Sequence, residues 1–463
     1  MDSREITEER RPVSTGTHAV SDGSRARRLP KALIRRARSD SLLRNSLFIM
    51  STTVVNSALG FVFWVLAARL YTAEVVGLTA AIVAAGTIVV LLASLGVGGT
   101  LIQSLPEQAG SSGWSRTVWA GMATAVSVSL VIGCVALLML PLITGELTAL
   151  HSARYATAFT VGTLAMTAGA ILDYVFIAER ASGAMFGRNS GVAASKVLVV
   201  VLLTAVTGAG AMNLLGAWAA ASVVGLGLGI IPLTRRVGLQ WPPRMVILAK
   251  TALALRSRLA GHQLIGMGSA LLPYLLPLLV TSRLSSRDNA YFYTAWMMAG
   301  IFLIIAPAVS QSLFAEGMHS PHELSVKARS ALSIIGALLA PCVLVVLVMG
   351  GTLLSAFGPA YEHHSVGLLQ IVLLASLPDA VTNVYIAVLR VQRRLATAAA
   401  LNLGMGIGIV ALSWVLLPSL GINSVGWAFL AMQLCGCAYV AVDLLRASRL
   451  TSAAQRLGHE EEA

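Results

Sequence analysis

The chain has 463 residues, of which 56% are hydrophobic and 11% are charged, and its mean hydropathy is +0.79. Soluble globular proteins carry about 25% charged residues, so this composition excludes a water-soluble globular domain. The net charge of +13 points to the anionic surface of a bilayer rather than to nucleic acid, because the polar and aromatic residues that read bases are scarce.

The first 45 residues are polar and rich in arginine, with no apolar core or cleavage site of a signal peptide. We expect residues 1–45 to form a basic, disordered cytoplasmic tail. Seven of the 14 residues from Arg25 to Arg38 are basic. They could bind anionic lipids of the inner leaflet, or they could serve only to orient the protein in the membrane.

A helix needs about 20 mainly apolar residues to cross the hydrocarbon core of a bilayer. Twelve stretches meet this requirement, although the short turn at 206–213 also allows a count of eleven. The sequence therefore predicts an all-α integral membrane protein. The predicted spans are 46–68, 75–98, 116–140, 156–178, 192–210, 213–232, 260–282, 290–310, 329–350, 365–388, 397–417 and 424–445.

The distribution of basic residues predicts that both termini are cytoplasmic. With the N-terminus inside, 29 basic residues face the cytoplasm and four face outward, as the positive-inside rule requires. The longest connection, 233–259, divides the spans into six and six. We therefore expect a cytoplasmic tail, an N-terminal bundle, a basic cytoplasmic linker, a C-terminal bundle and a second cytoplasmic tail, at 1–45, 46–232, 233–259, 260–445 and 446–463.

Features of an enzyme are missing from the sequence. No loop is long enough for a catalytic domain, and no GxxxxGK[ST] motif is present. The four cysteines lie in apolar runs without the spacing of a zinc site, and Glu362-His363-His364 lacks a distant third ligand. We expect neither catalysis nor a cofactor.

An internal repeat relates the two halves. Ala68-Arg69-Leu70 is followed by Glu74 and Thr79-Ala80, and Ser282-Arg283-Leu284 is followed by Asp288 and Thr294-Ala295. Both copies stand at the end of the first helix of their half. Six helices per half give both halves the same orientation, so the predicted pseudo-two-fold axis lies along the membrane normal, as in transporters that rock two bundles around a central site.

The motifs of both halves resemble those of a known family. They include Ala68-Arg69-Leu70, Glu74, Gly77, Ser94-Leu95-Gly96 and Leu105-Pro106-Glu107 after Asn45, and later Phe357-Gly358-Pro359-Ala360-Tyr361 and Leu368-Leu369-Gln370-Ile371. Residues 40–445 resemble the bacterial polysaccharide (O-antigen type) flippases of the multidrug/oligosaccharidyl-lipid/polysaccharide flippase superfamily. The resemblance implies a V-shaped pair of six-helix bundles that moves an undecaprenyl-diphosphate-linked sugar to the outer leaflet.

Arg69 and Arg283 are two of the four outward basic residues, the others being Arg154 and Arg287. They could bind the diphosphate or sugar of a substrate. They could instead clamp their own turns, Arg69 by pairing with Glu74 and Arg283 by pairing with Asp288.

Asp173 and Asp379 are the acidic residues deepest in predicted spans. A lone carboxylate at the bilayer centre costs about 2.5–3.5 kcal/mol on insertion scales, so such a residue normally faces a partner or a cavity. Both could be structural, or they could couple transport to an H⁺ or Na⁺ gradient. Pro378 would bend the helix beside Asp379 and free backbone groups there.

Other polar residues could contact a substrate. Thr52 and Asn56 follow Asn45 on one face of the first helix, where they could line a sugar-accepting cavity or pack against another helix. His262 and Gln263 open the seventh span on the cytoplasmic side, where they could bind a lipid headgroup or simply lie at the interface.

The leading hypothesis is a flippase of the bacterial plasma membrane that serves surface polysaccharide biosynthesis by alternating access. The polyprenyl tail of such a substrate can stay in lipid, whereas its sugar and diphosphate need a polar path. Glycosyltransferases and a polymerase of the same pathway would be its partners. The alternatives are a cation-coupled multidrug or metabolite exporter, which would prefer an acidic cavity, and a membrane polysaccharide polymerase or ligase, which would need a large outer loop.

Overall fold

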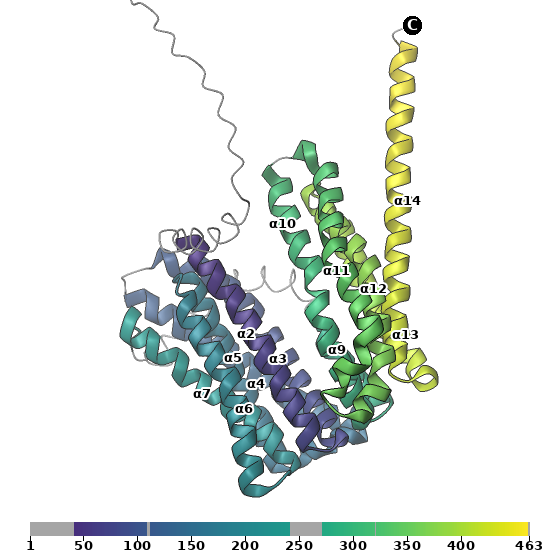
Figure 1. Cartoon of the computed structure of the whole chain (residues 1–463). Coiled ribbons are helices and arrows are strands. Elements are labelled where there is room, and N and C mark those ends of the chain that lie inside the picture. The colour runs from purple at the N-terminus through teal and green to yellow at the C-terminus, as the bar shows by residue number, and fades with distance from the viewer. Residues whose placement is uncertain (1–40, 109–111, 241–270, 320, 462–463) are drawn as a thin grey trace, which may run out of the picture.

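The computed structural model of the chain describes residues 41–108, 112–240, 271–319 and 321–461 (Figure 1). The described secondary structure is helical. The long helices are α2 (Ser41–Leu70), α3 (Ala73–Glu107), α4 (Ser112–Ile143), α5 (Ala153–Ala178), α6 (Ser182–Thr207), α7 (Ala211–Pro232), Leu271–Arg283, α9 (Ser286–Leu303), α10 (Ile305–His319), α11 (Leu324–Ser355), α12 (Pro359–Val391), α13 (Leu395–Leu420) and α14 (Asn423–Glu461).

Eleven candidate spans are long and apolar enough to cross a membrane within the described ranges. The shorter apolar helix Leu271–Arg283 occupies the second part of the predicted span 260–282, whose first part lies outside the described residues. The prediction of an all-α membrane protein is therefore confirmed. Most of the predicted tail 1–45 and of the predicted linker 233–259 also falls outside the described residues, so these assignments stay predictions.

One predicted span began in the wrong place. The sequence predicted a span at 192–210 and a cytoplasmic loop before it, whereas α6 begins at Ser182. Arg188 therefore lies inside this candidate membrane span, as Lys196 does. The predicted span started after Arg188 but already contained Lys196, and a charged residue is costly in hydrocarbon. That cost falls when the charge is paired inside the protein, as it is for Arg188.

A break divides the helical segment that crosses the membrane between Ser286 and Met318. Helix α9 ends at Leu303 and α10 begins at Ile305. Pro307 lies just beyond the break and has no amide N–H to donate to the carbonyl four residues earlier, which is that of Leu303. By contrast, α12 continues as one helix through Pro378, where the sequence predicted a bend, and α11 continues through Pro341.

The helices form two bundles that meet at one end. Helices α2–α7 pack among themselves as the N-terminal bundle, and α9–α14 pack among themselves as the C-terminal bundle. Figure 1 shows the two bundles close together at its lower end and diverging toward its upper end. Helix α3 packs against α9, and the largest apolar cluster contains residues of both bundles.

The approach of α3 to α9 requires a glycine. A Cβ atom on Gly77 would lie 1.6 Å from the backbone oxygen of Ser286, a distance that no side chain could tolerate. Asn289 Nδ2 donates a hydrogen bond of 2.8 Å to the oxygen of Gly77. The two bundles are therefore in direct backbone contact at their shared end.

Equivalent turns of the two halves have the same geometry. The turns α5–α6 and α12–α13 each contain an arginine in the left-handed region, Arg180 (φ 53°) and Arg393 (φ 61°). In both turns the next amide donates to the carbonyl five residues earlier, at 2.8 and 2.9 Å. The following turns, α6–α7 and α13–α14, each contain a left-handed glycine, Gly208 and Gly421. The two halves of the chain therefore resemble each other in backbone conformation as well as in sequence.

Candidate functional site

The N-terminal bundle contains a polar cavity of about 360 Å³. Its walls come from α2, α3, α5, α6 and α7, and two tyrosines of the C-terminal bundle, Tyr274 and Tyr293, complete them. The polar and charged side chains of the N-terminal bundle that line it are Asn56, Thr79, Thr87, Asp173, Arg188, Asn189, Lys196 and Ser222.

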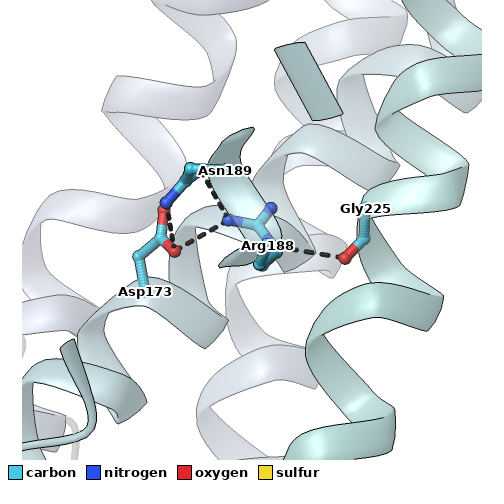
Figure 2. A network of polar contacts seen from close by, with 4 residues as sticks. All are labelled: Asp173, Arg188, Asn189 and Gly225. Carbon is cyan, nitrogen blue, oxygen red and sulfur yellow. Dashed lines mark hydrogen bonds and ion pairs between the residues drawn. The ribbon is translucent and has the colours of Figure 1, made fainter. Parts of the chain in front are cut away.

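An ion pair lies in the wall of this cavity (Figure 2). Arg188 Nη1 is 2.7 Å from Asp173 Oδ1, and Asn189 Nδ2 donates to the same oxygen at 3.0 Å. Arg188 Nε donates to the backbone oxygen of Gly225 at 3.2 Å, and its side chain is 7% exposed. Asp173 therefore has the structural partner that the sequence left as one of two interpretations.

Lys196 adds a second cation to the cavity. It follows Arg188 by two helical turns, which brings both side chains to similar sides of α6. It stands 14 residues after Ser182, about 21 Å along the helix and close to its middle. No ion pair of Lys196 occurs among the described residues, and Asp173 is already paired with Arg188. In the part of the chain that the structure describes, the lining thus holds one more basic than acidic side chain.

Sequence reasoning missed Arg188 and Lys196 as site residues because it counted both with the cytoplasmic basic residues, although Lys196 lies within the predicted span 192–210. Two signals could have revealed them. Their spacing of eight residues puts them on one side of a helix, and Asp173, only 15 residues before Arg188, required a buried partner.

Aromatic rings form another part of the cavity wall. Trp64 of α2 and Tyr293 of α9 have ring centroids 4.7 Å apart, so they contact each other across the two bundles. Phe63, Trp218 and Tyr274 also line the cavity. Such rings offer broad apolar faces, and those of tryptophan and tyrosine also carry a polar tip.

The polar residues predicted to share one face of the first helix, α2, have different surroundings. Asn56 lines the cavity, and its Oδ1 is buried without a hydrogen-bond partner among the described residues. Thr52 instead donates its hydroxyl to the backbone oxygen of Phe48 at 2.8 Å, within its own helix. The side chain of Asn45 and the residues His262 and Gln263 lie outside the described part of the chain.

Arg69 does not clamp its own turn as one interpretation proposed. Its Nη2 and Nε atoms donate to the backbone oxygens of Ser355 and Ala356, at 2.6 and 2.8 Å. These carbonyls lie at the C-terminal end of α11 in the other bundle, where no further helical turn follows, and the oxygen of Ser355 also accepts from the amide of Gly358 at 3.1 Å. Glu74, the expected partner, is instead 3.6 Å from Arg287 Nε of α9.

The proposed clamp of Arg283 was also wrong. The guanidinium carbon of Arg283 lies 4.4 Å from the ring centroid of Trp414 in α13, a cation–π contact. The expected partner, Asp288, bonds with Ser285 to cap α9. Sequence reasoning had considered only neighbours along the chain, and both arginines use partners that packing brings near.

Asp379 lies in a second, smaller cavity of about 200 Å³ in the C-terminal bundle. Gln433 Nε2 donates to Asp379 Oδ1 at 2.8 Å, and Thr382 Oγ1 donates to Gln433 Oε1 at 2.7 Å. Asn383 and Asn402 line the same cavity. Asp379 is 8% exposed and, unlike Asp173, has no cationic partner among the described residues.

Comparison with solved structures identifies the fold. The chain is similar to lipid II flippase MurJ in an inward closed conformation, with 11% identity, a TM-score of 0.69 and coverage of 86% of this chain and 87% of that one. It is also similar to a multidrug resistance MATE family transporter of the MOP superfamily. For the inward-facing conformation the identity is 15% and the TM-score 0.65, and the match covers 86% of this chain and 95% of that one. For an outward-facing conformation the identity is 14% and the TM-score 0.54, and the match covers 89% of this chain and 96% of that one.

No family model and no curated protein sequence matches the chain. The structural neighbours named above are a flippase and transporters, not enzymes. The chain therefore has the all-helical fold of these MOP superfamily membrane proteins.

Proposed function

We propose that this protein is a flippase that moves a polyprenyl-diphosphate-linked oligosaccharide across a bacterial plasma membrane by alternating access. The observation that carries this proposal is the cavity beside Arg188 and Lys196, with Asn56 and the aromatic pair Trp64–Tyr293 in its wall. It offers basic groups for a diphosphate, and amide groups and ring faces for a sugar.

The sign of the net charge of the residues that line the cavity distinguishes the leading hypothesis from the exporter alternative. An exporter of cationic drugs would need acidic groups facing its substrate. Among the described residues of the lining, the one acidic residue, Asp173, is bound to Arg188, and Lys196 leaves an excess of basic groups. Attraction between these groups and a phosphate therefore supports an anionic substrate.

The arrangement of the bundles supports alternating access. They meet at the end that contains Arg69 and Gly77 and diverge toward the other end (Figure 1). If the charge bias sets the orientation, the closed end is the outer one and the structure is inward-facing. The higher TM-score against the inward-facing than the outward-facing transporter, 0.65 against 0.54, agrees with this assignment.

Asp379 supplies a candidate for coupling to an H⁺ or Na⁺ gradient. Its cavity in the C-terminal bundle is separate from the basic cavity, and its carboxylate has only neutral hydrogen-bond partners among the described residues. The same feature would suit a cation-coupled exporter, which we keep as the second candidate function. In the flippase hypothesis, glycosyltransferases load the carrier before transport and a polymerase uses it afterwards.

The test compares Lys196→Gln with wild-type protein in a flipping assay. Proteoliposomes with polyprenyl-diphosphate-linked oligosaccharide in both leaflets are treated with an impermeant sugar-modifying enzyme, and the protected fraction is followed with time. We expect Lys196→Gln to slow flipping at least tenfold, because an interaction with the phosphate worth about 1.4 kcal/mol accounts for one factor of ten.

The matched control is Lys327→Gln, because Lys327 lies outside the cavity and forms a surface pair with Glu323 at 3.7 Å. It should flip at the wild-type rate. Equal rates for Lys196→Gln and wild-type protein would contradict the proposal. If the protein instead transports cations, and the transport rate is higher in Lys196→Gln than in the wild-type protein, the result would favour the exporter.

A further inference from the structure

A groove on the outside of the N-terminal bundle is separate from both cavities. It has a volume of about 520 Å³ and runs between α5 and α7, which pack against each other. Its lining residues are Ala153, Arg154, Thr157, Ala158, Val161, Met212, Ala219, Ala220 and Val223. None of them lines the basic cavity or the cavity of Asp379.

The groove forms where small side chains lie between larger ones on the surface of the bundle. Ala158 and Ala219 are 8% and 7% exposed and form its floor, while Val161 and Val223 are 42% and 45% exposed and face the surroundings of the bundle. The lining from Ala153 to Val161 and from Met212 to Val223 spans about 12 to 17 Å of helix. This length is close to half of the hydrocarbon thickness of about 30 Å, so the groove follows one leaflet.

Among the described residues, Arg154 is the one charged side chain that lines this mainly apolar groove, and it stands at one end of it. It occupies the second position of α5, where the chain enters the bundle from the segment Gly145–His151. Arg154 is exposed, and no ion pair of its side chain occurs among the described residues. Thr157, one turn further, adds a hydroxyl to the same end of the groove.

We propose that this groove binds one phospholipid with an anionic headgroup. An acyl chain lies against Ala158 and Ala219, and the headgroup phosphate contacts Arg154. Lipid tails are as apolar as the side chains of the groove, so shape and packing hold the chain in place. Selectivity for an anionic lipid comes from the charge of Arg154 at the interface.

A second copy of this chain is a weaker occupant of the groove. Small residues also allow helices to approach closely, so the same surface could serve helix packing. A two-fold dimer, however, places the same patch of both subunits face to face. It would bring two Arg154 side chains together without an acidic partner in the groove. Charge complementarity therefore favours a phosphate.

The experiment is native mass spectrometry of the full-length, delipidated protein titrated with palmitoyl-oleoyl phosphatidylglycerol or phosphatidylcholine. We expect the wild-type chain to retain one phosphatidylglycerol molecule in preference to phosphatidylcholine. Arg154→Gln should lower this preference about fivefold, the factor equivalent to about 1 kcal/mol for one basic residue at an anionic surface. Ala220→Phe should reduce the binding of both lipids by filling the groove.

Val131→Phe is the matched control, because Val131 is 64% exposed on α4 and lies outside the groove. It should bind lipid as the wild-type protein does. Val223→Trp repeats the block at an exposed position if Ala220→Phe does not fold. The proposal would be overturned by unchanged lipid selectivity in Arg154→Gln or by unchanged lipid binding in a folded variant with a blocked groove. It would also be overturned if Val131→Phe lost as much lipid binding as the blocked variant, or if the mass of two protein chains appeared in place of the lipid adduct. None of these results depends on the transported substrate.

Discussion

Two acidic residues in corresponding bundles have different surroundings. Asp173 is bound to Arg188, whereas Asp379 accepts from the neutral side chain of Gln433. Removing one partner of a buried ion pair leaves an uncompensated charge, so a change at Asp173 disturbs the structure as well as any function. Asp379 can be neutralised with less disturbance, which makes it the better residue for testing a role of charge.

At the residue scale, we predict that Asp379→Asn slows transport at least tenfold while the protein level stays normal. The Asn side chain keeps an oxygen that can accept from Gln433 Nε2, so the hydrogen bond of 2.8 Å can be preserved while the charge is lost. For the proposed flippase function, the measurement is export of the surface polymer in cells, with the protein level determined by immunoblot.

Glu362→Gln provides the control for this substitution, because Glu362 is exposed and lies outside the cavity of Asp379. It should export polymer normally. Wild-type export by Asp379→Asn at a normal protein level would exclude the carboxylate from the mechanism and leave it a static hydrogen-bond acceptor.

At the element scale, the end where the bundles meet is held by contacts to helix termini. Arg69 of the N-terminal bundle donates to the terminal carbonyls of α11. Glu146, also of the N-terminal bundle, accepts from the backbone amide of Ser286 at 3.2 Å, the first residue of α9. Each side chain carries the charge that complements the dipole of the helix end it touches.

We predict that Arg69→Gln shifts the conformational equilibrium toward separation at this end. A cation at an exposed helix C-terminus contributes about 0.3–1 kcal/mol, which corresponds to a change of about two- to fivefold in the equilibrium. The measurement is a distance distribution from electron spin resonance, with spin labels at Thr148 and His363, exposed residues of the two bundles.

Arg283→Gln is the control for this measurement, because Arg283 contacts Trp414 within the C-terminal bundle. Its distance distribution should match that of the unsubstituted protein. A similar shift in both variants, or no shift in Arg69→Gln, would show that the contact with α11 does not bias the equilibrium.

At the scale of the whole molecule, the predicted orientation can be tested by cysteine accessibility. Cysteines at Thr148 and Glu362 should react with an impermeant reagent in intact cells. Cysteines at Gln240 and Gln392 should react only after permeabilisation. The four positions are exposed on the protein and lie at opposite ends of the bundles, and the native cysteines would be replaced first.

The charge bias is the physical reason for this prediction, since basic residues near span ends are retained on the cytoplasmic side. The inclusion of Arg188 and Lys196 in α6 removes only two of the 29 inner cations, so the bias persists. Reaction at Gln240 in intact cells, with Thr148 protected, would reverse the orientation and turn the proposed inward-facing state into an outward-facing one.

The sequence by itself determined where most helices lie, because the transfer of a segment into hydrocarbon depends mainly on its own residues. Predicted spans such as 156–178 and 397–417 closely match α5 and α13. The predicted span 192–210 began ten residues too late, because Arg188 is tolerated inside α6 through its ion pair with a residue of another helix. The same limit applied to Asp173, whose need for a partner was predicted without identifying Arg188.

Only the tertiary structure decided the partners of Arg69 and the composition of the basic cavity. Arg69 and Ala356 are 287 residues apart, and the cavity joins residues from α2 to α9. Which side chains meet across such distances depends on how the bundles pack, and local hydropathy does not encode it. The charge of Lys196 was visible in the sequence, but its place in one cavity with Trp64, Asp173 and Tyr293 is a property of the folded protein.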